Sequence, residues 1–202
     1  MFYETAGNRH GLARDPFKAI VVPRPIGWIG TRSKTGVNNL GPYSFFNAIS
    51  DRPKLVMFSS SGYKDSARNA EETGCFTCNF VSRNLLDQMN QSSAPYATGV
   101  DEFQKTGLAI GEARLIEAPY VAEAFAVLEC KVTEIMQPKG LDGSPSDNWA
   151  VFGEVVGIHI REEIIVDGKL DMRLARPVAR MGYMDYAEGS DVFEVMRPTV
   201  PD

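Results

Sequence analysis

The chain has few of the residues that metal and redox sites need. Its 202 residues include two histidines and three cysteines. Cys75 and Cys78 share a Cys-x-x-Cys spacing, but residues 75–81 have the composition of a strand, in which positions three apart point to opposite faces. We therefore expect structural thiols without a disulfide framework, and no metal site.

The sequence also lacks a basic excess and a long hydrophobic run. The formal net charge is -5, which argues against a nucleic-acid partner. No apolar run approaches the roughly 20 residues that span a bilayer, and the start has no basic segment followed by an apolar one. We expect no membrane association and a cytoplasmic location. A hydrophobic share of 44% is ordinary for a globular protein, and residues 1–202 are read as a single domain.

Short strand-like segments dominate the chain. Residues 26–32 and 39–49 flank the turn signal Ser33-Lys34-Thr35-Gly36 and predict a hairpin. Further strands are predicted at 54–59, 75–81, 113–118, 126–135 and 151–166. Two helices are predicted, at 66–74 with Ser66 as N-cap and Gly74 just past the end, and at 82–90. Since strands and helices do not alternate and glycine-rich nucleotide motifs are absent, the pattern favours an antiparallel barrel over a doubly wound sheet.

A polar segment rich in serine, glycine and alanine runs from residue 91 to 111. Long loops in compact domains are often functional, so this one is a candidate cover for a site. A solvent-exposed loop whose two aromatic residues pack on the body of the protein is an equally good interpretation.

A cluster of hydroxyl groups next to a lysine suits an anion. Ser59, Ser60 and Ser61 precede Gly62, and Lys64 adds a point charge. Ser66 then opens the predicted helix, whose first N–H groups are unpaired and favour negative charge. A phosphate group fits this combination, although a polar turn before an ordinary capped helix would have the same composition.

A second polar and aromatic segment suits a flat heterocycle. Gly41 and Pro42 break the strand pattern within residues 39–47, Ser44 and Asn47 can donate hydrogen bonds, and three aromatic residues can form walls. Strict alternation would place Ser44 and Asn47 on opposite faces unless a bulge intervenes. A core strand with its aromatic residues turned inward is the alternative.

Three residues outside these segments have open roles. Trp28 is expected in the core. Arg24 lies between two prolines in extended backbone and is read as a surface charge. His159 falls in a strand pattern, where a core position is favoured over a place in the site.

Taken together, these segments resemble a known family. The motifs are R-P-I-G-W-I-G-T from Arg24, N-x-L-G-P-Y-S-F-F-N-A-I-S from Asn38, D-R-P-K-L-V-M-F-S-S from Asp51, K-D-S-x-x-N from Lys64, and E-C at 129–130. They closely resemble the flavin reductase-like, FMN-binding split-barrel family, which includes the flavoredoxin-type proteins. The resemblance runs from about residue 17 to 187.

The resemblance implies a mainly β fold, a Greek-key split barrel with a few short helices. It also implies a homodimer with flavin sites near the subunit interface. Carried over to this chain, the FMN-binding residues are Thr31, Asn39, Leu40, Gly41, Pro42, Tyr43, Ser44, Phe45, Phe46, Asn47, Ser59, Ser60, Ser61, Lys64 and Ser66. In two places the chain departs from the family pattern, with Gly41 instead of alanine and Ser66 instead of threonine. Both keep a small residue and a hydroxyl.

The implied activity is hydride transfer from NAD(P)H, a transient co-substrate, to FMN, with reduced flavin passed to an oxygenase or another electron-transfer partner. In such an enzyme the flavin performs the redox chemistry and the protein positions it, so no catalytic acid or base is assigned. A non-enzymatic FMN electron carrier of the flavoredoxin type is the main alternative. A flavin-binding module with a sensing or storage role is a third, because fold does not settle function.

Overall fold

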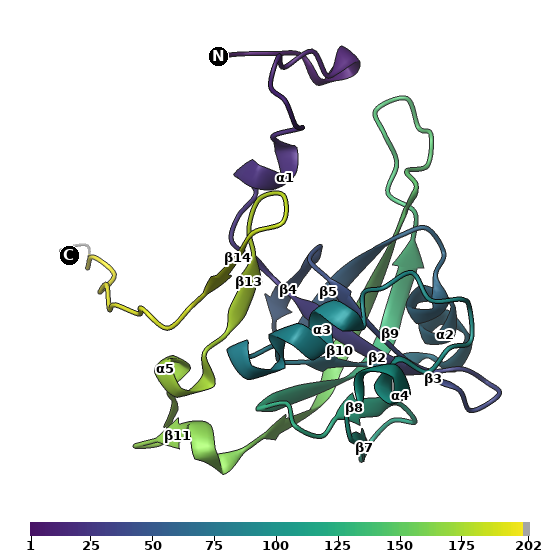
Figure 1. Ribbon diagram of the computed structural model, residues 1–202, viewed down its shortest axis with the longest axis vertical. Helices are drawn as coiled ribbons and strands as arrows, with labels where there is room; N and C mark the ends of the chain where they lie inside the picture. The colour runs from purple at the N-terminus through teal and green to yellow at the C-terminus, as the bar shows by residue number, and fades with distance from the viewer. Residues whose placement is uncertain (200–202) are drawn as a thin grey trace.

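The centre of the molecule is a seven-stranded antiparallel sheet, shown in Figure 1 in a computed structural model that describes residues 1–199. The strands lie in the order β3-β2-β6-β9-β10-β5-β4. Their bounds are β2 Gly27–Arg32, β3 Asn38–Tyr43, β4 Phe46–Asp51, β5 Lys54–Ser61, β6 Cys75–Asn79, β9 Ala126–Met136 and β10 Asn148–Ile160.

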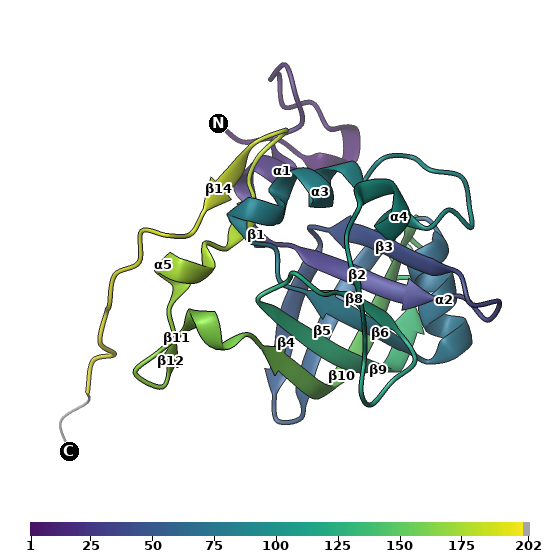
Figure 2. The same cartoon turned by 60° about the horizontal axis from the view of Figure 1, so that its bottom comes forward.

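The two edges of this sheet are joined by a very short piece of chain. β3 and β4 lie at opposite edges, yet only Ser44 and Phe45 separate them in the sequence. The sheet must therefore curl until its edges approach each other (Figure 2). A Cβ atom on Gly27 in β2 would lie 2.5 Å from Cδ2 of Phe46 in β4, so glycine is needed where the Phe46 ring packs across the curl. The result is a half-closed barrel, which confirms the predicted antiparallel split barrel.

The predicted hairpin at 26–49 is confirmed in its first part only. β2 and β3 pair with Thr31 opposite Asn39. The second predicted strand is interrupted, because the chain crosses from one edge of the sheet to the other between Tyr43 and Phe46. Residues Phe46–Asp51 pair with β5 instead.

Two hydrophobic clusters lie on the two faces of the sheet. Trp28 and Ile29, neighbours in β2, are both fully buried and belong to different clusters, as strand alternation requires. Phe58 and Phe76 pack edge to face in the cluster of Ile29. Trp28 is a core residue, as predicted, and its indole N–H donates to Ser92 Oγ at 2.9 Å.

All three cysteines are free and buried, in agreement with the expected structural thiols. Cys75 and Cys78 both lie in β6, and Cys78 shares a cluster with Cys130. Burial raises the pKa of the Cys78 thiol well above its ordinary value. The thiol is therefore kept protonated and unreactive.

The helices that flank the sheet are short. They are α2 (Asp65–Thr73), the 3-10 turn η2 (Arg83–Leu85) that runs into α3 (Leu86–Gln91), and α4 (Glu102–Thr106). The prediction of Ser66 as N-cap was wrong: Lys64 holds the cap position, and Ser66 is buried inside the first turn. Gly74 is the C-cap of α2, as predicted, with φ at 73°.

One strand prediction was wrong, and another extended too far. Residues 113–118 form a loop between the short strands β7 (Ile110–Glu112) and β8 (Pro119–Val121). The predicted strand at 151–166 ends at Ile160. The 3-10 turn η3 (Glu162–Ile164) follows and separates β10 from β11 (Ile165–Val166). β11 pairs with β12 (Lys169–Leu170) and not with the barrel, so the residues after Ile160 do not extend β10.

A segment from the N-terminal part of the chain pairs with one from the C-terminal part beside the barrel. β1 (Arg24–Pro25) pairs with β13 (Val178–Arg180), which forms a hairpin with β14 (Tyr186–Glu188). This hairpin lies next to α1 (Phe17–Ile20), while α5 (Met172–Ala175) follows β12 and the 3-10 turn η1 (Thr5–Gly7) lies near the N-terminus (Figures 1 and 2).

Candidate functional site

Three segments that are distant in the sequence line one pocket, here called the β3 pocket. Its volume is about 440 Å³, a size typical of small-molecule sites. The first segment is β3 from Asn39 to Tyr43, the second is the start of α2, and the third is the loop after α3 together with Glu102. The loop residues are Ser92, Ser93, Ala94, Pro95, Tyr96 and Thr98. The predicted cover segment at 91–111 therefore borders the pocket.

A hydrogen-bonded group of polar side chains forms the floor of the β3 pocket. The Asn39 side-chain amide donates to Ser66 Oγ at 2.8 Å and to Thr31 Oγ1 at 3.1 Å. A Cβ atom on Gly41 would lie 3.4 Å from Ser66 Oγ, in ordinary van der Waals contact. Burial raises the pKa of the Tyr43 hydroxyl, although the nearby Ser66 and Ser60 hydroxyls oppose this shift. These contacts join β3 to α2.

The start of α2 gives the β3 pocket a positive end. Lys64, Asp65 and Ser66 line the pocket at the first turn of this nine-residue helix. The first N–H groups of a helix have no partner within it, and the helix dipole favours an anion there. Lys64 is exposed and forms no ion pair within residues 1–199.

The two carboxylates of the pocket are engaged by the protein itself. Asp65 accepts hydrogen bonds from Arg68 at 2.5 Å and from the Gly99 N–H at 3.0 Å. Glu102 is 8% exposed and accepts from the Leu40 N–H at 2.9 Å. Burial raises the pKa of the Glu102 carboxyl. Lys64 is thus left as the cation available to a ligand.

Seven of the predicted site residues come together in the β3 pocket: Asn39, Leu40, Gly41, Pro42, Tyr43, Lys64 and Ser66. Thr31 lies beneath them, buried, where it accepts from Asn39 and Asn69. The other seven predicted residues lie outside the lining of the β3 pocket.

The serine run lies at the end of β5, outside the pocket lining. Ser59 accepts from the Asn148 side chain at 2.9 Å, Ser60 is buried and donates to the Gly62 carbonyl, and Ser61 is exposed. Because side chains alternate along a strand, the three hydroxyls do not converge.

The residues after Tyr43 also separate. Ser44 lines a neighbouring pocket, and Phe45 lies under the ammonium group of Lys18. Phe46 packs against the cluster of Ile29, and Asn47 is exposed on the edge strand β4.

The neighbouring pocket, here called the hairpin pocket, lies between α1, α3 and the β13–β14 hairpin. Its volume is about 570 Å³, and it shares Pro42 and Ser93 with the β3 pocket. Its lining residues are Asp15, Phe17, Lys18, Arg24, Ile26, Pro42, Ser44, Met89, Asn90, Ser93, Arg180, Tyr183, Met184 and Tyr186. Most of these were missed by sequence reasoning.

Arg24 shapes this pocket, and its prediction as a surface charge was wrong. The residue is 7% exposed. Its guanidinium group donates to the carbonyls of Lys18, Val21 and Met181, and lies 3.4 Å from Ser44 Oγ. A single side chain therefore attaches α1 and the β13–β14 hairpin to the junction between the two sheet edges.

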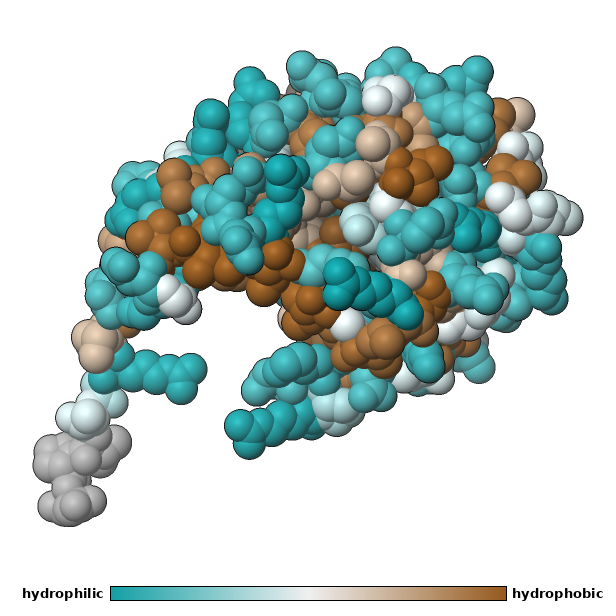
Figure 3. All heavy atoms as spheres, turned by 90° about the horizontal axis from the view of Figure 1, so that it is seen from below, coloured by the Kyte–Doolittle hydropathy of each residue, from teal (hydrophilic) through white to brown (hydrophobic). Residues whose placement is uncertain are grey.

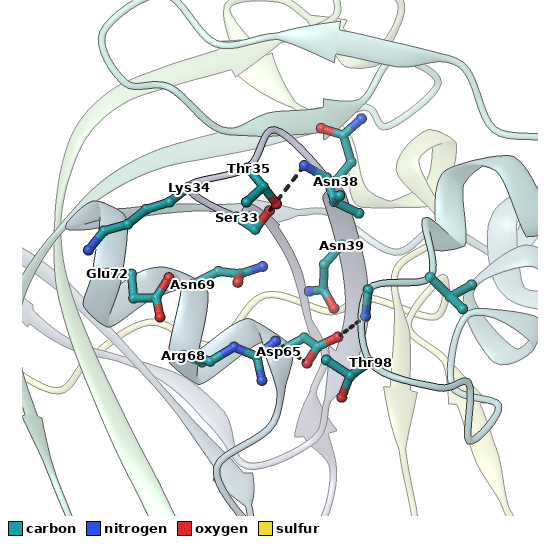
Figure 4. A pocket seen from close by; sticks show the side chains of 13 residues that line it. Ser33, Lys34, Thr35, Asn38, Asn39, Asp65, Arg68, Asn69, Glu72 and Thr98 are labelled. Carbon is teal, nitrogen blue, oxygen red and sulfur yellow. Dashed lines mark hydrogen bonds and ion pairs between the residues drawn. The ribbon is translucent and has the colours of Figure 1, made fainter.

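A third, smaller pocket adjoins the other end of the β3 pocket and shares Asn39, Asp65 and Thr98 with it. Figure 4 shows side chains of β3, α2 and the 33–37 turn converging around it, with Asp65 bound to the loop at Gly99. Within residues 1–199, the Oδ1 atom of Asn69 is buried without a hydrogen-bond partner. The three pockets thus follow one another along β3.

His159 lies outside all three pockets. It is half-buried, and its Nε2 atom lies 2.5 Å from Oε1 of Glu129. The buried Glu129 carboxylate also accepts the N–H groups of Arg114 and Leu115. His159 therefore belongs to a structural network that anchors the 113–118 loop, close to the favoured core interpretation.

Among the described residues, no helix combines the length and the apolar character needed to cross a bilayer. This agrees with the absence of long hydrophobic runs in the sequence.

Residues 19–173 match a family model described as flavin reductase like domain. An uncharacterized protein of Halalkalibacterium halodurans is 32% identical over 185 residues, which cover 89% of this chain and 88% of that protein. The structure is similar to nitrilotriacetate monooxygenase component B from Bacillus cereus, with a TM-score of 0.86 and 27% identity over 96% of this chain and 98% of that one. It is also similar to 2-nitrobenzoate 2-nitroreductase from Pseudomonas fluorescens, with a TM-score of 0.85 and 25% identity over 100% and 99% of the two chains.

Proposed function

The chain belongs to the flavin reductase like domain family, and on that basis we propose that it is an FMN-binding oxidoreductase reduced by NAD(P)H. The observation that carries the proposal is the convergence of β3, Lys64 and Ser66 on one pocket. FMN is a phosphomonoester joined through a polyol chain to a flat ring. A pocket with a cation, a helix start, hydroxyls and close backbone approach matches that chemistry.

The floor of the β3 pocket supports the fit. Gly41 presents bare backbone between Ser66 and Tyr43, so a ligand can lie directly against β3. In the proposed arrangement, Lys64, Ser66 and the first N–H groups of α2 hold the phosphate. Asn39 orients the Ser66 hydroxyl, because its side-chain amide donates to that hydroxyl from β3.

The other end of the pocket suits the ring. Pro42 and Ser93 lie where the β3 pocket opens into the hairpin pocket. When bound, FMN supplies the two-electron redox chemistry of the reaction. The residues around Pro42 would hold one face of the ring, and the hairpin pocket leaves room for a nicotinamide to approach the other.

Stopped-flow reduction of the FMN-loaded protein tests this proposal. We expect NADH or NADPH to bleach the visible flavin absorbance within seconds under anaerobic conditions. A protein that binds FMN but is reduced only by a protein electron donor would be an electron carrier, which contradicts the enzymatic part of the proposal. A protein that causes no change in the visible spectrum or fluorescence of added FMN would contradict both parts.

We also propose that the protein forms a homodimer. The C-terminal segment exposes Phe193 and Met196, at 86% and 79% of their surface. Figure 3 shows apolar residues bordering a hollow between this extension and the rest of the molecule. A second copy would cover such surfaces, since large exposed apolar patches mark interaction sites. Light scattering after size-exclusion chromatography should give twice the chain mass, whereas a monomer at micromolar concentration would contradict the proposal.

A partner oxygenase is the proposed consumer of the reduced flavin, in the cytoplasm where NAD(P)H is supplied. Support comes from the similarity to a protein named as component B of a monooxygenase. If the partnership exists, reduced FMN made by this protein should sustain an added flavin-dependent oxygenase. A chain that keeps its FMN through dialysis and during turnover would argue against a diffusing product.

A further inference from the structure

The hairpin pocket is lined by two cationic side chains, Lys18 and Arg180. Lys18 Nζ lies 5.8 Å from the centre of the Phe45 ring, and the Arg180 guanidinium lies 4.5 Å from the centre of the Tyr186 ring. Neither side chain forms an ion pair in the part of the chain that the structure describes. Both are therefore available to an anion that enters the pocket.

The other charged groups of the pocket are already occupied. The guanidinium N–H groups of Arg24 donate to backbone carbonyls and to Ser44. Asp15, the acidic residue of the lining, accepts from the Phe17 N–H at 2.8 Å and from the Asn8 side chain at 2.9 Å. Arg180 donates through Nη2 to the Tyr183 carbonyl, which leaves Nε and Nη1 without an acceptor within residues 1–199. A guanidinium edge with two free N–H directions suits a carboxylate.

Aromatic and apolar side chains surround these cations. Phe17, Tyr183 and Tyr186 line the pocket together with the buried Ile26 and Met89. Flat aromatic faces favour a flat ligand, since ring pairs stack or meet edge to face. A ligand that combines a ring with one negative charge would use both features of the pocket.

We propose that the hairpin pocket binds a planar aromatic carboxylate, with the ring among Phe17, Tyr183 and Tyr186 and the carboxylate between Lys18 and Arg180. The shared residues Pro42 and Ser93 would place this ligand at the ring end of the β3 pocket. Only that last placement rests on the proposed function. The binding itself does not require FMN.

Calorimetry with benzoate and its neutral isostere benzamide tests the proposal on protein with and without FMN. Benzoate should bind both forms, and benzamide should bind at least several-fold more weakly. Lys18→Gln should weaken benzoate binding about fivefold, the factor that corresponds to roughly 1 kcal/mol for an exposed ion pair. Lys34→Gln is the matched control and should leave benzoate binding unchanged, because Lys34 lines the pocket at the far end of β3.

Arg180→Lys provides a second variant that keeps the charge and removes the planar donor edge, and it should also weaken benzoate. Equal binding of benzoate and benzamide, or unchanged benzoate affinity in both Lys18→Gln and Arg180→Lys, would overturn the proposal. So would a loss of NADPH affinity in Lys18→Gln without a loss of benzoate affinity, since the cations would then serve a nucleotide phosphate. Benzoate binding by a protein that fails to bind FMN would leave this inference standing and remove the proposed function.

Discussion

Asn39 donates a hydrogen bond of 2.8 Å to the hydroxyl of Ser66, and so ties β3 to the first turn of α2 beneath the β3 pocket. Both residues are buried. The contact is structural and, in the proposed function, also orients a phosphate ligand. Stability and ligand affinity should therefore change together when it is removed.

Ser66→Ala is expected to lower the free energy of unfolding by about 1–2 kcal/mol, because it removes a buried acceptor from the Asn39 amide. It should also weaken FMN binding. Ser66→Thr keeps the hydroxyl and should retain FMN. Urea unfolding of the ligand-free protein and fluorescence titration with FMN measure the two effects. Unchanged stability and unchanged affinity in Ser66→Ala would contradict the role of this contact.

Lys64→Ala is expected to weaken FMN binding about tenfold, since a single charge-assisted contact is worth roughly 1.5 kcal/mol or more. Stability without FMN should hardly change, because Lys64 is exposed. Lys54→Ala is the matched control: Lys54 pairs with Asp51 in the β4–β5 turn, away from the pocket. Equal FMN retention by the two variants in dialysis would remove Lys64 from the phosphate site.

Arg24→Met should detach the N-terminal segment and the β13–β14 hairpin from the barrel. The change leaves three carbonyls without their donor, and the loss of hydrogen bonds to a charged group costs about 1.5–3 kcal/mol. Hydrogen exchange should rise in residues 178–188 while the central strands stay protected. Arg24→Lys should not restore protection, because lysine lacks the planar fork. Uniform loss of protection across all strands would point instead to global unfolding.

Glu102 should make the stability of the ligand-free protein depend on pH. Burial raises the pKa of its carboxyl above the ordinary 4.5, although the Leu40 N–H opposes this shift. A group with a raised folded pKa binds protons more tightly in the folded state. Its stabilising contribution is complete below the unfolded pKa and declines as the pH rises through the folded value.

The variant Glu102→Gln removes this dependence and keeps an acceptor for the Leu40 N–H. As the pH is raised from about 4 to 8, the free energy of unfolding of the unmodified chain should therefore fall relative to that of the variant. Denaturant unfolding at several pH values measures the difference. A difference that stays constant, or that grows toward acid pH, would show that the Glu102 carboxyl does not carry the expected shift.

Local chemistry explains which parts of the candidate site were predictable from the sequence. Gly41, Lys64 and Ser66 belong to short motifs whose composition already indicates close approach, charge and a helix start. The run Ser59 to Ser61 has a similar composition but lies in a strand, where alternation separates the hydroxyls. Sequence reasoning predicted this strand only as far as Ser59 and therefore grouped three hydroxyls that do not meet.

Long-range contacts explain what sequence reasoning missed. Arg24 donates to the carbonyl of Met181, 157 positions away, and no local pattern records such a partner. The buried Glu129 holds the backbone of Arg114 and Leu115, which explains why residues 113–118 form a loop despite their strand-like composition. The barrel itself was predictable, because it depends on many short strands and not on single partners.

The Ser44-Phe45 linker limits how far the two edges of the open barrel can separate. From Tyr43 to Phe46 the chain takes three steps of about 3.8 Å, so the edges cannot part by more than about 11 Å at that end. The linker sets no such limit at the opposite end, where β3 begins at Asn38 and β4 finishes at Asp51. Near Pro42 the covalent linker therefore fixes how far apart the two edges lie, whereas near Asn39 β3 is held by its hydrogen bond to Ser66 of α2.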